Sequence, residues 1–161
     1  MATRQLRLLL LTTLLLAVLV GCGAVEVEVS AITDTLVSGT AGYVQGLEEG
    51  PAYAFSLTVP EDWVEQFETA NTGARISFNY TGGEDANVPI FVMEALSPEQ
   101  YWEQNGSYPG IYYNVVNKLD TYFVYYVPTY FEIEGLPADD YQALVDIVPS
   151  VISTFDAAPI E

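Results

Sequence analysis

Residues 90–93, Ile90-Phe91-Val92-Met93, decide the fold that we expect, because they are apolar at both of the alternating positions of a strand. Successive side chains of a strand point to opposite faces of a sheet, so this run predicts a central strand that is covered on both sides. Pro89 is tolerated at the start of such a strand. The sequence therefore predicts one sheet that lies between two layers of cover.

The sequence around this run supplies further strands. Residues 53–59 and 76–80 alternate between apolar and polar side chains, and residues 111–116 and 121–127 form two more strand candidates around a turn at 118–120. Short connections favour antiparallel neighbours. We expect a central antiparallel sheet of about five or six strands.

Two helices are expected to cover that sheet. Residues 97–104 predict a short helix, with Ser97 as its N-cap and Pro98 at its first position. A longer helix closes the chain, and Pro149 within it predicts a kink or a break near Val148. Its apolar stripe recurs at steps of three and four and contains Tyr141, Leu144, Val145, Val148, Val151, Ile152 and Phe155. The predicted fold class is α+β.

The N-terminus has the pattern of a secretory signal. Arg4 and Arg7 precede an apolar run at residues 8–20, which is too short for a transmembrane helix of roughly 20 residues. Residues 19–22 read Leu-Val-Gly-Cys and resemble the bacterial lipobox. The resemblance implies cleavage between Gly21 and Cys22, a diacylglyceryl group on the Cys22 thiol, and a lipid anchor on the extracytoplasmic face of a bacterial membrane, either the cell membrane or the outer membrane.

These signals predict four segments. Residues 1–21 form the signal peptide, 22–50 a lipidated N-terminus with a flexible tether, 51–157 one globular domain and 158–161 a short tail. As a flexible coil the tether would span roughly 25 to 30 Å, which would hold the domain clear of the headgroups. An alternative stays open, because the Val/Glu alternation at residues 25–29 could add an edge strand.

The charge of the mature chain restricts its partners. Cleavage leaves Arg75 and Lys118 against 22 acidic residues, which gives a formal charge of −20. Nucleic-acid binding depends on Lys and Arg that neutralise phosphates, so no nucleic-acid partner is expected. The same charge opposes contact with anionic lipid headgroups.

Catalysis is not expected, because the usual nucleophiles and bases are absent. The sequence has no histidine, and its one cysteine, Cys22, would be lipidated. Serine–histidine and cysteine–histidine catalysis and a zinc site built on His or Cys are therefore excluded. A carboxylate-dependent hydrolase stays as an alternative. The loop at residues 82–87 could offer oxygen ligands to calcium, but it lacks the alternating acids and terminal glutamate of an EF-hand and is better explained as a solvated hairpin loop, so we expect no metal and no cofactor.

Aromatic residues supply the candidate contacts for a partner or a ligand. Tyr101 and Trp102 are neighbours on the short helix and cannot both face inward, so one of them should be exposed. We select Trp102 and Tyr108 as possible contacts with a protein partner, a small molecule or a glycan. Trp63 is expected to fill the core instead.

The order of elements resembles the PsbP-like domains of bacterial lipoproteins. Residues 55–63, Phe-Ser-Leu-Thr-Val-Pro-Glu-Asp-Trp, match the opening of those domains, and residues 151–155, Val-Ile-Ser-Thr-Phe, match the end of their final helix. The resemblance implies an α/β/α sandwich and a non-catalytic binding or assembly module, here for a protein partner in the cell envelope. An envelope solute or glycan binder is the first alternative and the carboxylate hydrolase the second.

Overall fold

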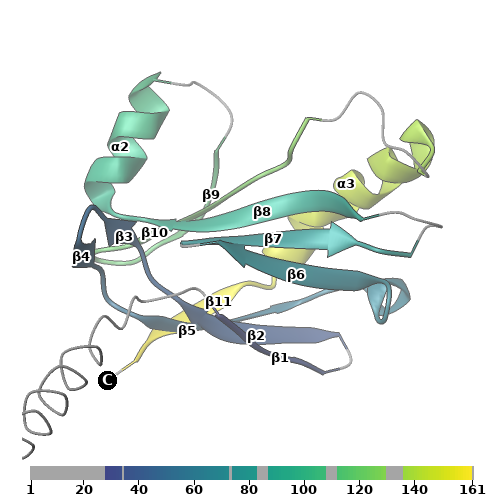
Figure 1. Cartoon of the computed structure of the whole chain (residues 1–161), viewed down its shortest axis with the longest axis horizontal. Coiled ribbons are helices and arrows are strands. Elements are labelled where there is room, and N and C mark those ends of the chain that lie inside the picture. Colours follow the sequence, from purple (N-terminus) through teal and green to yellow (C-terminus); the bar gives the residue numbers. More distant parts are fainter. Residues whose placement is uncertain are drawn as a thin grey trace, which may run out of the picture.

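The computed structural model describes residues 28–33, 35–72, 74–82, 87–107, 112–129 and 136–160. Within these residues the chain is α+β, with two antiparallel sheets, a short hairpin and two α-helices (Figure 1). The predicted fold class is confirmed. An antiparallel sheet of five strands is present as predicted, but a second antiparallel sheet of four strands was not predicted.

The five-stranded sheet contains the strand that was predicted to be central. Its order is β6-β7-β8-β10-β9, and every neighbouring pair is antiparallel. The strands are β6 (Phe67–Thr72), β7 (Arg75–Tyr80), β8 (Val88–Leu96), β9 (Tyr113–Asn117) and β10 (Tyr122–Tyr126). Residues 90–93 lie within β8, the middle strand, and all four are buried. Their apolar pattern on both faces therefore predicted their place correctly.

The four-stranded sheet has the order β1-β2-β5-β11 and is also antiparallel. Its strands are β1 (Glu28–Thr33), β2 (Leu36–Ala41), β5 (Tyr53–Thr58) and β11 (Asp156–Pro159). The strand predicted at residues 53–59 thus exists, but it does not share a sheet with β7. Alternation identifies a strand, whereas it does not say which other strand will be its neighbour.

Shorter elements complete the fold. The hairpin β3 (Val44–Gln45) and β4 (Glu48–Glu49) follows β2, and a 3-10 turn, η1 (Glu61–Trp63), follows β5. The helices are α2 (Pro98–Ser107) after β8 and α3 (Ala138–Ile152) before β11. Figure 1 shows α2 and the β3–β4 hairpin at one end of the molecule and the turn between β1 and β2 at the opposite end.

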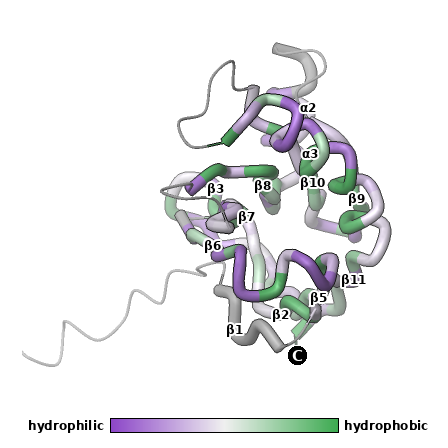
Figure 2. Tube along the Cα trace, turned by 90° about the vertical axis from the view of Figure 1, so that its right-hand side faces the viewer, coloured by the Kyte–Doolittle hydropathy of each residue, from purple (hydrophilic) through white to green (hydrophobic). Residues whose placement is uncertain are grey.

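The core lies between the two sheets. Figure 2, turned by 90°, shows the five-stranded sheet above the four-stranded one. One apolar cluster joins Phe55 and Leu57 of β5 to Phe78 and Phe91 of the larger sheet. Trp63 is 1% exposed and belongs to the same cluster, so the prediction that it fills the core is confirmed.

Helix α3 contacts β8 of the larger sheet and β5 of the smaller one. Val148, Val151 and Ile152 of its predicted stripe are buried in the core. The helix runs without a break through Pro149 and ends at Ile152. Phe155 therefore lies beyond the helix, but its ring still packs against the ring of Phe55 at 6.1 Å between centroids.

The predicted tether and tail are wrong in part. Residues 36–41 of the expected tether form β2, which pairs with β5 along its whole length and has Val37 fully buried. Of the alternative edge strand at residues 25–29, Glu28 and Val29 lie in β1, which forms the edge of the smaller sheet, and residues 25–27 lie outside the described part of the chain. At the other terminus, residues 156–159 form β11 and not a tail. The folded unit therefore extends further in both directions than its apolar pattern indicated.

Candidate functional site

The structure places one of the selected contact residues on the surface. Trp102 lies on α2 and its side chain is 65% exposed. Its neighbour Tyr101 turns toward the sheet and stacks on Tyr122 of β10, with 4.5 Å between the ring centroids. The prediction that one of the two adjacent aromatics is exposed is confirmed. Tyr108, like Gly21 and Cys22, lies outside the described residues.

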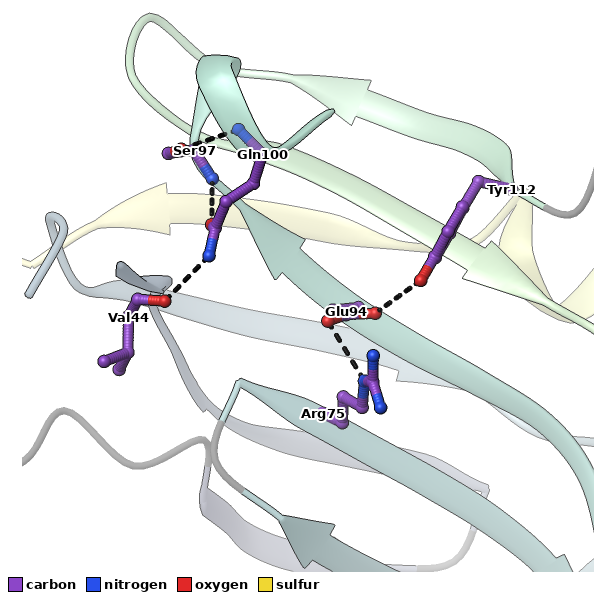
Figure 3. Close-up of polar contacts among 6 residues, drawn as sticks. All are labelled: Val44, Arg75, Glu94, Ser97, Gln100 and Tyr112. Atoms are coloured by element: carbon purple, nitrogen blue, oxygen red, sulfur yellow. Dashed lines mark hydrogen bonds and ion pairs between the residues drawn. The ribbon is translucent and has the colours of Figure 1, made fainter. Parts of the chain in front are cut away.

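Directed hydrogen bonds hold α2 in place. The backbone N–H of Gln100 donates to the Ser97 hydroxyl oxygen at 3.1 Å, and the backbone N–H of Ser97 donates to the Gln100 side-chain oxygen at 2.9 Å (Figure 3). These two bonds form a capping box, so the predicted N-cap at Ser97 is confirmed. The Gln100 amide nitrogen also donates to the carbonyl of Val44 at 2.8 Å, which joins the start of α2 to the β3–β4 hairpin.

A second feature is a polar cluster on the outer side of the five-stranded sheet, the side that faces away from the four-stranded sheet. Glu94 of β8 is 8% exposed. One of its carboxylate oxygens lies 3.0 Å from Nε of Arg75, which is directly opposite on β7. The other accepts a hydrogen bond from the Tyr112 hydroxyl at 3.2 Å (Figure 3). A buried carboxylate needs such partners, since an unpaired buried charge is strongly unfavourable.

The residues of this cluster shift one another's pKa values. Burial and the negative charge of Glu94 raise the pKa of Tyr112 to about 12. The phenol therefore stays protonated at physiological pH and donates to the carboxylate. Burial is the largest single influence on Arg75 and lowers its pKa, but the charge of Glu94, the hydrogen bond to Glu94 and the charges of Tyr126 and Tyr112 together outweigh burial, so the pKa is raised. The cluster acts as a cross-link between β7, β8 and the residue before β9, and Tyr112 is not available as a base.

A small pocket lies on the inner side of the sheet. Its lining is almost wholly apolar, and its one charged residue is Glu94, whose carboxylate is already paired with Arg75 and Tyr112 on the outer side. A binding pocket for a polar small molecule would carry several converging polar groups. The residues of this lining are Ala41, Phe55, Ala74, Ile76, Met93, Glu94, Ala95, Phe123 and Phe155.

The metal alternative concerned residues 82–87, of which 83–86 lie outside the described part of the chain. At Gly82, a Cβ atom would lie 2.1 Å from the side-chain oxygen of Gln66, so this glycine permits close packing at the start of the loop. Over the residues that the structure describes, no three Cys, Asp or Glu side chains gather closely enough to hold a metal ion.

The Arg75–Glu94–Tyr112 cluster was not predicted from the sequence. Glu94 was visible as an acidic residue inside an otherwise apolar run, which is a signal of a buried charge that needs partners. Its partners lie 19 positions before it and 18 positions after it, so only the strand pairing identifies them.

The site and the fold define an α+β domain with an exposed aromatic contact and an internally paired polar cluster. No family model, curated protein or solved structure matches the chain. None of the described helices is long and apolar enough to cross a bilayer.

Proposed function

We propose that the chain is an extracytoplasmic bacterial lipoprotein, anchored through lipid on Cys22, whose domain is a non-catalytic binding or assembly module for an envelope protein. We also propose that the domain is related to the PsbP-like sandwich, because residues 55–63 and 151–155 resemble the motifs of that fold. The lipobox at residues 19–22 and the short apolar run before it support the anchor.

The distribution of charge is the observation that carries the binding role. Of the two cations in the mature chain, Arg75 is paired with Glu94, and Glu94 is the one buried acid among the described residues downstream of β2. The other described acidic side chains downstream of β2 are exposed, namely Glu48, Glu49, Glu61, Asp62, Glu65, Glu68, Glu99, Glu103, Asp120, Asp139, Asp140, Asp146 and Asp156. A surface of this kind selects and attracts a partner with complementary positive charge.

The same observation disfavours the hydrolase alternative. A glycosidase needs two carboxyl groups on either side of the bond that it cleaves, within a substrate cleft. One carboxyl group donates a proton, and the other acts as the nucleophile or as the base that activates water. Glu94 already accepts from Arg75 and Tyr112, and the other described acids downstream of β2 lie in solvent, where no cleft shields them. Acids of this kind suit recognition better than catalysis.

The anchor is tested by mass spectrometry of the protein purified from its own envelope. We expect loss of residues 1–21 and a diacylglyceryl adduct on Cys22, and a Cys22→Ala chain that keeps its leader and is released from the membrane fraction. An unmodified Cys22 thiol in the native protein would disprove the anchor.

The binding role is tested by capturing the native lipoprotein from solubilised envelope at low and at high salt. Because the Debye length falls from about 10 Å at 0.1 M to about 3 Å at 1 M, an envelope protein bound through charge should be retained at low salt and released at high salt. A partner that is retained equally at both concentrations would contradict charge recognition.

Trp102 favours a second candidate function, the binding of a glycan. Its exposed ring stands edge-on to Tyr101 at 5.2 Å between centroids and could stack against a sugar face. Isothermal titration with envelope glycan fragments tests this candidate. Heat of binding that disappears in Trp102→Ala, but persists in a variant of the exposed Tyr113, would replace the protein partner with a glycan.

A further inference from the structure

Three large apolar side chains stand in solvent on three neighbouring elements, two of them in turns and one on α2. Leu47 in the β3–β4 turn is 102% exposed, Leu119 in the β9–β10 turn is 91% exposed, and Trp102 on α2 is 65% exposed. We call these three residues the apolar end. A single exposed apolar side chain is ordinary, whereas several gathered at one end of a domain mark a site of contact with a partner or a membrane.

The three tips belong to elements that touch one another. Gln100 of α2 donates to Val44 of β3, and the Gln45 amide donates to the Glu99 carboxylate, so the hairpin is fixed to the first turn of α2. The stack of Tyr101 on Tyr122 fixes α2 to the start of β10, immediately after the turn that carries Leu119. Figure 1 shows α2 and the hairpin at the same end of the molecule.

The turn geometry presents Leu47 outward. Gln45 and Glu48 pair directly, which leaves Gly46 and Leu47 as a two-residue turn. Gly46 has φ +65°, the conformation that glycine adopts without strain at the first position of such a turn. A polar residue would satisfy the second position equally well, so the fold does not require leucine there.

The N-terminal strand begins at the same end. Glu28 of β1 lies opposite Thr40, and Thr40 is followed closely by the β3–β4 hairpin. Six Cα–Cα steps separate Cys22 from Glu28, and a fully extended chain of that length reaches about 21 Å. A lipid on Cys22 therefore keeps this end of the domain within about 21 Å of the bilayer. Strands β1 and β2 and the β3–β4 hairpin occupy most of residues 28–50, so most of the expected tether belongs to the folded domain.

We infer that the apolar end rests on the lipid surface, with Leu47, Trp102 and Leu119 inserted into the interfacial region of the bilayer. The inference rests on the proposed lipid anchor, and it names lipid as the ligand of the surface around Trp102. Tryptophan suits this position because its ring is apolar and its N–H can bond to headgroups. The protein partner then meets the surfaces that face away from the bilayer.

The charge around the apolar end sets the lipid preference. Glu48 and Glu49 follow Leu47, and Asp120 follows Leu119, with Lys118 as the nearby cation. These acids repel anionic headgroups, so insertion should be stronger in phosphatidylcholine than in phosphatidylglycerol at low salt. At 1 M salt, where the Debye length is about 3 Å, the two lipids should give similar insertion.

Trp102 itself provides the measurement, because the other tryptophan, Trp63, is buried. The mature chain is coupled through Cys22, its one thiol, to maleimide-bearing phosphatidylethanolamine in phosphatidylcholine vesicles whose acyl chains carry bromine near the headgroup. We expect a blue shift and quenching of Trp102 emission. The signal should vanish in Trp102→Phe, which retains only Trp63.

Matched leucine variants test the geometry. Leu47→Gln and Leu119→Gln should each reduce the quenching of Trp102. Leu36→Gln is the control, because Leu36 is also exposed, at 47%, but starts β2 at the opposite end of the sheet from Thr40 and the hairpin. It should leave the quenching unchanged, and circular dichroism checks that all three variants fold.

Each outcome of these experiments either supports or overturns the contact with lipid. Vesicles that retain the coupled protein while Trp102 emission stays unquenched would overturn lipid contact and leave the anchor intact. Protection of Trp102 by a captured envelope protein, without quenching by bromolipid, would likewise overturn it and assign this end to a protein. An unmodified Cys22 in the native envelope would disprove the anchor, whatever the coupled protein shows. The inference is supported if bromolipid quenches Trp102 and if, among the three leucine variants, Leu47→Gln and Leu119→Gln weaken the quenching while Leu36→Gln does not.

Discussion

The two sides of the five-stranded sheet both bury apolar side chains, but they differ in their polar contacts. On the inner side the rings of Phe67, Phe78 and Phe91 stack in a row, with centroid distances of 5.9 and 4.2 Å. On the outer side, Glu94 is held by Arg75 and Tyr112, and α2 is held by its capping box and one tyrosine stack. Apolar packing is indifferent to direction, whereas hydrogen bonds fix an orientation. The inner side therefore supplies stability, and the outer side positions what the molecule presents to its surroundings.

The largest expected effect breaks the inner side. Phe78→Ala removes the middle ring of the row, at a position that is fully buried, and should lower the free energy of unfolding by about 3–5 kcal/mol. Urea denaturation measures the loss. Phe78→Leu keeps most of the volume and should lose clearly less, and a similar loss in both variants would mean that the ring stack adds little beyond apolar area.

The next effect breaks the polar cluster on the outer side. Glu94→Ala leaves the Arg75 charge and the Tyr112 hydroxyl without their shared partner, and because Arg75 is half-exposed we expect a loss of about 1–2 kcal/mol. Chemical denaturation measures it, with Glu103→Ala on the solvent side of α2 as the control. An equal loss in the two variants would contradict the role of the cluster.

A smaller effect loosens α2 alone. Gln100→Ala removes one bond of the capping box and the bond to Val44, at about 1 kcal/mol in total stability. Hydrogen exchange should accelerate in the amides of α2 and the β3–β4 hairpin and stay unchanged in β7 and β8. Uniform acceleration across the sheet would show that α2 is part of the cooperative core.

The pH dependence of stability sharpens the contrast further. The pKa of Tyr112 is raised to about 12 in the folded protein by burial and by Glu94, against an ordinary value near 10 in the unfolded chain. The folded state thus keeps a proton that the unfolded state loses. The contribution of Tyr112 is complete below pH 10 and is lost as pH rises from 10 to 12. Tyr112→Phe should flatten this part of the stability profile, and an unchanged profile would exclude Tyr112 as its source.

The smallest effect concerns the exposed ring. Trp102→Ala should change the free energy of unfolding by less than about 0.5 kcal/mol, because the side chain is mostly in solvent. Thermal unfolding followed by far-ultraviolet circular dichroism measures it. A loss comparable to that of Phe78→Leu would mean that Trp102 supports the fold and is not kept for contact.

The contrast between the two sides also explains how much could be predicted from the sequence. The inner side follows from three patterns: alternation identified β5, a run that is apolar on both faces identified β8, and helical periodicity identified the stripe of α3. β2 and β11 were missed because small and polar residues dominate them, and β11 has Ala157 as its one buried side chain. The division into two sheets was missed because a strand pattern contains no information about its neighbours.

The outer side was predicted only where its contacts are local. Ser97 was found as a cap because its partner Gln100 lies three residues away, a spacing that is readable in sequence. The contacts of Glu94 with Arg75 and Tyr112 and of Tyr101 with Tyr122 span 18 to 21 positions and depend on strand register. The exposure of Leu47 was not predicted, because an isolated leucine after a glycine belongs to no periodic pattern.

The path of β11 has a practical consequence. This last strand returns beside β5 and brings Ile160, whose N–H donates to the carbonyl of Ala52, to the end of the molecule where β1 begins. Domains whose termini lie close together tolerate relocation of those termini. A circular permutant that joins the two termini and opens the chain at the β1–β2 turn should keep both sheets. In the chain with its original termini, a reporter inserted at that turn would lie at the end of the domain farthest from the anchor.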